Sequence, residues 1–280
     1  STNFYEVGGI LERAADAESE DLLAQIHTYR DTTIASSTTP AAGIRSITYN
    51  HISGRLSGEE VADYTQTYNS SLVVSQTSTN FYEVAGILER AANASSDDLL
   101  AEVHTYRQGT VAASATPVAG IRSITYNHIS GRLSGEELAD YTQTYNSSLT
   151  ITQTSTNFYD VSGVLQRAAN AGSEDLLAQI HTYRDTTIAS SIAPATGIRS
   201  ITYNHISGRL SGEELADYTQ TYNRGLLVTQ TSTNFYEVSG ILERAANAGS
   251  EDLLAEVHTY RQGTIAASTT PASGIRSITY

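Results

Sequence analysis

The sequence has no cysteine, no methionine and no tryptophan, and all 16 of its basic residues are arginine because lysine is absent too. Without cysteine, the chain can form neither disulfides nor thiolate metal sites. The absence of cysteine and methionine also removes the most oxidisable side chains, which suits a long-lived protein outside the cell. We therefore expect an extracellular or cell-surface location.

Positive charge and long apolar runs are also scarce. The 30 acidic residues exceed the 16 basic ones and give a formal net charge of -14. Nucleic-acid binding requires a basic stripe, so we expect no nucleic-acid partner. No apolar run approaches the roughly 18 residues that cross a bilayer, so we expect no membrane insertion. The sequence shows no signal peptide, begins at Ser1 and stops within a repeat, so we expect a processed chain or a section of a longer one.

The sequence consists of tandem copies of one 77-residue repeat. The phrase Ser-Thr-Asn-Phe-Tyr begins at Ser1, Ser78, Ser155 and Ser232. Two types of copy alternate, because the first and third share Gln-Ile-His-Thr-Tyr-Arg-Asp whereas the second and fourth share Glu-Val-His-Thr-Tyr-Arg-Gln. The predicted organisation is repeat 1 at 1–77 (type A), repeat 2 at 78–154 (type B), repeat 3 at 155–231 (type A) and a truncated repeat 4 at 232–280 (type B).

A weaker similarity divides each repeat in two. Shifted by 39 residues, Glu20 and Tyr29 of the first half fall on Glu59 and Tyr68 of the second. We interpret each repeat as two half-units of 38–39 residues. Units of this length are typical of helical hairpins stacked in a solenoid.

Local patterns favour helices within these half-units. Ser19, Thr39 and Ser57 stand where N-caps are expected, and Gly109 and Gly225 stand where left-handed C-caps are expected. Apolar residues follow at roughly helical spacing: Leu22, Leu23, Ile26 and Tyr29, then Ile44 and Ile47, then Val61, Tyr64 and Tyr68. The sequence therefore predicts a mainly α fold of tandem helical hairpins, stacked as an elongated solenoid or rod, with short strands at the unit joints.

No motif predicts catalysis or a cofactor. Phosphate loops, nucleophile elbows and zinc-protease motifs are absent, so we expect no catalytic residues and no enzyme. The histidines are never paired at ligand spacing, which favours structural roles. One acidic cluster (Asp16, Glu18, Glu20 and Asp21) is a candidate calcium site, although helix capping also explains these residues.

Two further groups of residues are candidate sites. Asn69, Asn93 and Asn146 fit the N-glycosylation pattern. Tyrosines recur at fixed places in each copy, where they either fill a core or contact a partner. We interpret Tyr5, Tyr49, Tyr126 and Tyr203 as candidate contacts between units.

Near-identical units stacked in series favour a structural role. We expect a protein that associates with itself and forms or extends an extracellular filament, surface layer or stalk. The alternative is a repeat adhesin that binds glycans or a cell-surface protein through exposed aromatic side chains. A third possibility is an intracellular helical scaffold, which the composition disfavours.

Overall fold

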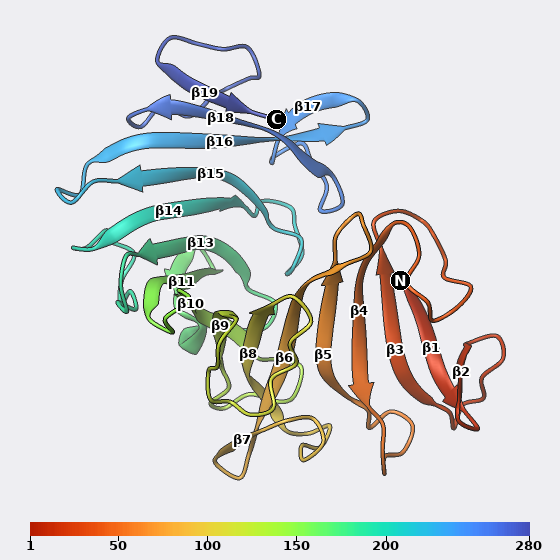
Figure 1. The fold of residues 1–280 in the computed structure, drawn as a ribbon. Coiled ribbons are helices and arrows are strands. Elements are labelled where there is room, and N and C mark those ends of the chain that lie inside the picture. Colours follow the sequence, from red (N-terminus) through yellow and green to blue (C-terminus); the bar gives the residue numbers. More distant parts are fainter. The chain divides into compact units, whose positions relative to one another are not determined.

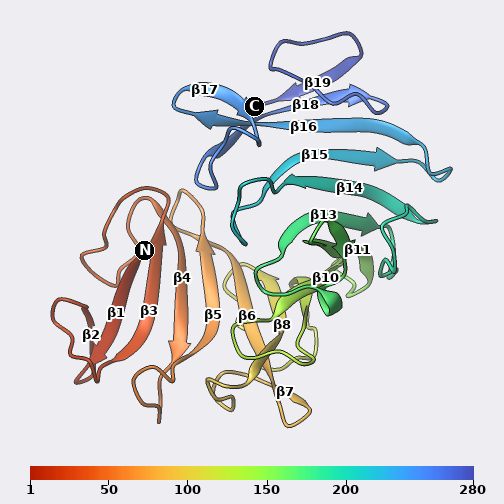
Figure 2. The same ribbon diagram turned by 180° about the vertical axis from the view of Figure 1, so that it is seen from behind.

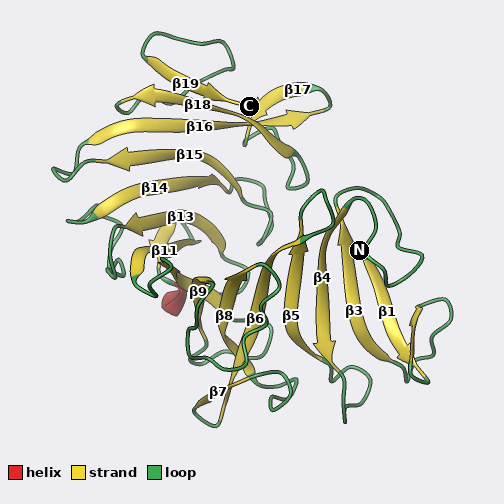
Figure 3. Ribbon diagram, viewed as in Figure 1, coloured by secondary structure: helices red, strands yellow, loops and turns green.

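The computed structural model describes residues Ser1–Tyr280 and is nearly all β (Figure 1). It contains nineteen strands and one short 3-10 helix, and no α-helix (Figure 3). The predicted mainly α solenoid of helical hairpins is therefore wrong, and strands form the body of each copy rather than its joints. None of the helical structure is long or apolar enough to cross a membrane.

The element bounds follow the sequence repeat. The first eight strands are β1 (Thr2–Val7), β2 (Ile10–Arg13), β3 (Leu22–Tyr29), β4 (Ile44–His51), β5 (Val61–Tyr68), β6 (Val74–Val84), β7 (Ile87–Glu89) and β8 (Leu99–Arg107). They are followed by β9 (Ile121–His128), β10 (Leu138–Tyr145), β11 (Ile151–Val161), β12 (Val164–Gln166), the 3-10 helix η1 (Ala168–Asn170) and β13 (Leu176–Tyr183). The last are β14 (Ile198–His205), β15 (Leu215–Tyr222), β16 (Val228–Val238), β17 (Ile241–Arg244), β18 (Leu253–Arg261) and β19 (Ile275–Thr279).

The chain divides into two compact units. Unit 1 holds Ser1–Glu137 with Thr144–Thr150, and unit 2 holds Leu138–Gln143 with Ile151–Tyr280. In unit 1 the long strands β1, β3, β4, β5, β6, β8 and β9 pair antiparallel in that order. Unit 2 repeats the pattern through β11, β13, β14, β15, β16, β18 and β19. Within each unit, Figures 1 and 2 show these strands side by side from both directions.

A short hairpin strand accompanies one long strand of every copy. β2, β7, β12 and β17 fold back on the ends of β1, β6, β11 and β16. β6 illustrates the arrangement, because β8 pairs along one edge while β5 and β7 share the other. Each copy thus adds four long strands and one short one to the meander.

Regularly placed β-bulges explain why the sequence looked helical. Tyr29 pairs with Ile44 but Thr28 pairs with Ser46, so Arg45 is an extra residue in β4. The bulge allows Ile44 and Ile47, three residues apart, to enter the same core cluster. Ala24 in β3, Asp63 in β5 and Ser75 in β6 are extra residues of the same kind. Each bulge turns the two-residue period of a strand into a local spacing of three.

Two core clusters per copy hold the sheet together. Cluster A of the first copy contains Phe4, Tyr29, Ala35, Ile44, Ile47 and Tyr68, and cluster A of the third contains Phe158, Tyr183, Ala189, Ile198, Ile201 and Tyr222. The loop after β3 covers cluster A, where the backbone N–H of Ala35 donates to Thr2 Oγ1 at 3.0 Å. Cluster B contains Val61, Tyr82, Ala91 and Ala94 beneath the loop between β7 and β8. The predicted caps therefore lie in strand-connecting loops and turns, not at helix ends.

Left-handed backbone occurs beside the predicted glycine caps rather than at them. Gln108 and Leu226 have φ angles of 62° and 61°, whereas Gly109 and Gly225 are not in the left-handed region. Leu226 closes the turn between β15 and β16, as Leu72 (φ 60°) closes the turn between β5 and β6. In that turn Asn69 Oδ1 accepts hydrogen bonds from the backbone N–H groups of Ser71 and Val73, both at 3.0 Å.

Candidate functional site

The boundary between successive copies lies inside a strand. Thr77 ends repeat 1 and Ser78 begins repeat 2, and both belong to β6. The boundaries of the later copies fall within β11 and β16 in the same way. The copies are consequently joined without a linker. We define the repeat junction as Arg55, Ala62 and Asp63 of one copy with Tyr82, Arg90, Ala91 and Ala94 of the next.

A bidentate ion pair crosses each repeat junction. Arg90 Nε donates to Asp63 Oδ1 at 2.8 Å, and Nη2 donates to Asp63 Oδ2 at 2.5 Å. Both side chains are largely shielded, with 19% and 18% exposed, which makes the pair stronger than one on an open surface. The same pair recurs as Asp140–Arg167 and Asp217–Arg244.

The arginine of this pair also reaches a covering loop. Arg90 Nη1 donates to the backbone oxygen of Ala112, and the same bonds run from Arg167 to Ala189 and from Arg244 to Ala266. Asp63 is the extra residue of the bulge in β5. The guanidinium therefore ties together the β5 bulge of one copy and the loop that covers cluster A of the next.

A buried tyrosine forms the second contact of the repeat junction. Tyr82 Oη donates to the backbone oxygen of Ala62 at 2.6 Å, and Asn80 Nδ2 donates to the same oxygen at 3.0 Å. Tyr159 and Tyr236 make the same bond to Ala139 and Ala216, each at 2.7 Å. Burial raises the pKa of Tyr82 to about 12, so its hydroxyl keeps the donated proton at any physiological pH.

A second arginine closes the junction over two small residues. Arg55 Nη2 donates to the backbone oxygens of Ala91 and Ala94, and Arg209 does the same for Ala245 and Ala248. Ala91 is 0% exposed and Ala94 is 5% exposed, so a larger side chain has no room at either position. The junction is thus a set of bonds between fixed groups, suited to holding copies together.

The predicted calcium residues do not converge on one point. Asp16, Glu18 and Glu20 are exposed in the turns before β3. Asp21 Oδ2 accepts a hydrogen bond from the backbone N–H of Glu18 at 2.7 Å, which closes a turn. No group of three or more His, Cys, Asp or Glu side chains in Ser1–Tyr280 has the geometry to hold a metal ion. The capping interpretation of Asp21 applies to a turn rather than a helix.

The predicted glycosylation residues are all exposed, but their side chains are engaged. Asn69 and Asn146 lie in the turns after β5 and β10, where each Oδ1 accepts two backbone hydrogen bonds. Asn93 Nδ2 donates to Glu89 Oε2 at 2.8 Å. Attachment of a glycan to these side chains stays a prediction.

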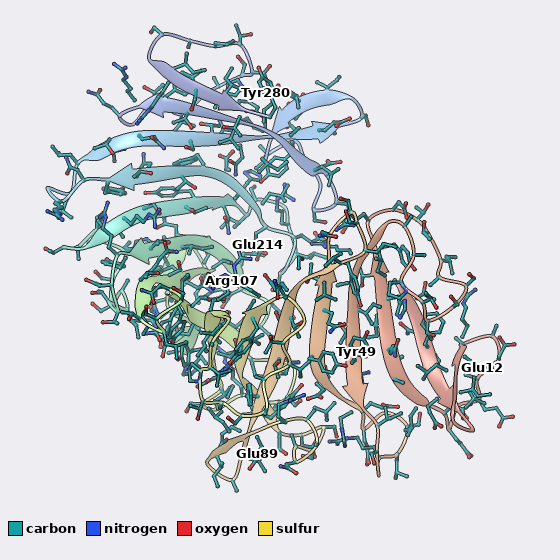
Figure 4. The ribbon with its side chains drawn as sticks, viewed as in Figure 1. Glu12, Tyr49, Glu89, Arg107, Glu214 and Tyr280 are labelled. Carbon is teal, nitrogen blue, oxygen red and sulfur yellow. The ribbon has the colours of Figure 1, made fainter.

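The four candidate tyrosines lie within strands of the sheet. Tyr49 lies in β4 (Figure 4). Its ring stacks on that of Tyr64 of β5 with centroids 4.5 Å apart, and Tyr203 stacks on Tyr218 at the same distance. Tyr5 pairs with Leu23 of β3, and Tyr126 pairs with Glu102 of β8. Their rings are half-buried. A contact with another unit through any of the four stays a prediction.

Four histidines belong to the interior. His27, His104, His181 and His258 are 0% exposed, and each packs against the phenylalanine of its copy. Their Nε2 atoms contact glutamine in type A copies and glutamate in type B copies. Burial lowers the pKa of His27, and it lowers the pKa of His181 to about 4.

Sequence reasoning missed the residues of the repeat junction. Asp63, Arg90 and Arg55 carry no motif, and none of them was among the predicted candidate residues. One signal was available, because a lysine-free chain keeps arginine at the same positions of each copy. Arginine is the cation that binds carboxylates and carbonyls through a fixed fork of donors.

No protein-family model matches the chain. No curated protein matches it significantly either. The functional argument therefore rests on the contacts that recur between the copies of this chain.

Proposed function

We propose that this chain is a structural segment that gains length by adding near-identical copies, as part of an extracellular filament, surface layer or stalk. The observation that supports the proposal is the repeat junction, whose ion pair and tyrosine hydrogen bond recur at three copy boundaries. A junction that reproduces itself allows any copy to follow any other. The chain works as a spacer, not as an enzyme.

The junction is suited to transmitting force because it contains no flexible link. Each copy boundary runs through a strand that is hydrogen-bonded to a long strand on either edge, as β6 is to β5 and β8. Pulling two copies apart therefore breaks ladder hydrogen bonds, the Asp63–Arg90 pair and cluster B together. The absence of cysteine and methionine suits this role in an oxidising environment.

Electron microscopy of the native material, paired with light scattering across a dilution series, tests this proposal. We expect long uniform fibres that persist on dilution, because covalent length and repeated contacts both resist dissociation. Short particles of a single size that never associate, in native material as well as in the isolated chain, would contradict it.

A second candidate function rests on the stacked tyrosine pairs. The Tyr49–Tyr64 and Tyr203–Tyr218 pairs are half-buried, and half-buried aromatic faces are suited to contact with sugar rings. A glycan array and calorimetry test this adhesin alternative. If it holds, Tyr64→Ala with Tyr218→Ala weakens binding and Tyr280→Ala does not. No glycan bound by the unaltered chain would eliminate the alternative.

A further inference from the structure

One face of each unit is lined with hydroxyl and amide groups and carries no core cluster. In β6 the side chains of Thr77, Thr79 and Phe81 are buried, whereas those of Gln76 and Ser78, which alternate with them, are half-buried. Strand register aligns Ser78 with Thr65 of β5 and Thr65 with Thr48 of β4. Thr48 Oγ1 and Thr65 Oγ1 are hydrogen-bonded at 2.9 Å.

We call this surface the hydroxyl face. In unit 1 it comprises Thr28, Ser46, Thr48, Thr65, Thr67, Gln76, Ser78 and Thr105. Unit 2 carries the same rows, with hydroxyl pairs Ser155–Thr182, Thr202–Thr219 and Ser232–Thr259. No acidic residue is among these positions, although the chain contains 30.

One exposed arginine per copy stands at the margin of the hydroxyl face. Arg122 Nη1 donates to Gln76 Oε1 at 3.1 Å, Arg199 donates to Gln153 at 2.9 Å, and Arg276 donates to Gln230 at 3.1 Å. Arg45 occupies the same bulge position in the first copy. All four side chains are exposed, and none forms an ion pair.

Most other arginines of a copy already bind groups within the chain. In the third copy, Arg167 binds Asp140, Arg184 donates to the backbone oxygen of Ile198, and Arg209 donates to Ala245 and Ala248. Arg224, in the turn after β15, is exposed and forms no ion pair, and Arg199 is the unpaired arginine that lies beside the hydroxyl face. In the first copy Arg13 also forms no ion pair, because no copy precedes it in this sequence.

Exposed acids gather at the far end of the same strands. The turn before β5 carries Glu59, and its counterparts are Glu136 and Glu213. The turn before β3 carries Glu20, and its counterparts are Asp97, Glu174 and Glu251. Arg45 is the second residue of β4, whereas the turn with Glu59 comes after the end of β4. The turn with Glu20 comes before β3, and because β3 is antiparallel to β4, the start of β3 lies beside the end of β4. Asp31 and Asp185 lie near the arginine end of the type A copies, but the acidic turns gather at the opposite end, so each copy has an arginine margin and an acidic edge at opposite ends of its strands.

We propose that the arginine margin of the hydroxyl face docks laterally against the acidic turns of a second copy of this chain. Charge and period both indicate this partner, because the arginines recur every 77 residues and the acidic turns of opposite charge recur at the same interval. A second copy of the chain therefore presents carboxylates at the same 77-residue interval, whichever of its repeats lies opposite a given arginine. This inference rests on the proposed structural function and names the contact between neighbouring segments.

The affinity of a single arginine–carboxylate pair is weak, and the affinity of the whole contact comes from several pairs together. Each arginine–carboxylate pair is exposed and therefore screened by salt, while simultaneous engagement of several pairs raises the overall affinity. The Debye length falls from about 30 Å at 0.01 M salt to about 8 Å at 0.15 M. Lateral association should therefore weaken about tenfold or more across that range.

The test compares two charge-matched variants of the full chain by sedimentation velocity at both salt concentrations. The first replaces the four marginal arginines (Arg45→Gln, Arg122→Gln, Arg199→Gln and Arg276→Gln). The second adds four acids at the opposite, acidic end, in the exposed segments that follow β2, β7, β12 and β17 (Ala15→Glu, Ala92→Glu, Ala169→Glu and Ala246→Glu). Both variants have the same net charge, so only the position of the change differs.

We expect the unaltered chain to associate at low salt, the arginine variant to lose that association and the alanine variant to keep it. Equal loss in both variants, association unaffected by the arginine substitutions, or an unaltered chain that stays monomeric at low salt would overturn the proposal. Electron microscopy separates this result from the structural function. Native filaments that stay single and unbundled at low salt contradict the lateral contact alone, whereas the absence of filaments contradicts the structural function.

Discussion

At the residue scale, each copy keeps a leucine in a conformation that leucine rarely adopts. Leu72, Leu149 and Leu226 have φ angles of 60°, 61° and 61° in equivalent hairpin turns. Left-handed backbone costs a residue with a Cβ roughly 1–2 kcal/mol. The asparagine that begins each turn accepts two backbone hydrogen bonds, which offsets part of that cost.

Replacing these leucines by asparagine should stabilise the protein. Asparagine tolerates the left-handed region, and the leucine side chains are only partly buried, with 41%, 42% and 39% exposed. We expect each Leu→Asn change to add about 0.5–1 kcal/mol to the free energy of unfolding. Thermal and urea unfolding measure the effect. Leucine→alanine controls retain the strain and should not stabilise, so a gain in the alanine variants would argue against backbone strain as the cause.

Two of the buried histidines, His27 and His181, make stability depend on pH. The pKa of His181 is about 4 in the folded chain, below the value of about 6.5 expected when unfolded. Between these values the unfolded chain takes up a proton that the folded chain does not. Stability is therefore complete above pH ~6.5 and falls as the pH drops toward ~4, by about 3 kcal/mol for this residue.

Unfolding measured from pH 7 to pH 4 checks this prediction. His181→Gln removes the titrating group, so the loss of stability across that range should become smaller than in the unaltered chain. An unchanged pH dependence would show that His181 is not the group responsible. Gln179→Glu serves as a matched comparison, because it gives His181 the glutamate partner that His104 has in Glu102.

At the scale of elements, the sequence predicted repetition far better than secondary structure. The 77-residue period is visible in Ser-Thr-Asn-Phe-Tyr, and the strands follow it, since β3, β8, β13 and β18 begin at Leu22, Leu99, Leu176 and Leu253. The apolar spacing was misleading because the bulges at Ala24, Arg45 and Asp63 interrupt the two-residue alternation. A bulge depends on pairing with a neighbouring strand, so the spacing within one segment does not reveal it.

The site was harder to predict than the elements. Asp63 and Arg90 are 27 residues apart in the sequence and meet because β5 and β7, which Arg90 follows, both pair with β6. The tyrosines were correctly singled out as recurrent, yet Tyr82 differs from its counterpart Tyr5 in having Ala62 within reach. These contacts depend on strand order, which local patterns do not contain.

A double-mutant cycle measures the ion pair of the repeat junction. We expect Asp140→Ala and Arg167→Ala each to destabilise the chain, and their coupling energy to be about 1–2 kcal/mol because the pair is bidentate and partly shielded. Arg199→Ala, which removes an exposed arginine without an ion pair, should change stability by less than about 0.5 kcal/mol. A coupling energy near zero would mean that the pair does not hold the copies together.

At the scale of the whole molecule, the copy is the unit that can be added or removed. Four long strands per copy is an even number, so the chain enters and leaves each copy in the same direction. Equivalent contacts recur at each repeat junction whether the flanking copies are type A or type B. The residues that differ between type A and type B copies leave the ion pair of the repeat junction unchanged.

Removing one whole copy should leave a folded protein. Deletion of 78–154 joins Thr77 to Ser155, which restores the Thr-Ser step found within β6 and β11. We expect an unchanged β-sheet circular dichroism signal per residue and a thermal midpoint within a few degrees of the full chain. Deletion of 78–116, a half-unit, is the control. It joins β6 to a loop, so we expect it to unfold or aggregate, and a folded product would instead support the predicted half-units.

The position of the copy boundary inside a strand has a genetic consequence. Because no loop or turn marks where a repeat begins, the boundary is a convention of counting, and every position in the copy is an equally good breakpoint. Unequal recombination between two copies conserves strand length, bulge position and ion pairing wherever the crossover falls, provided that equivalent codons align. Such a gene can lengthen or shorten its product in whole copies without a dedicated recombination site, and chain length becomes a trait that selection can adjust quickly.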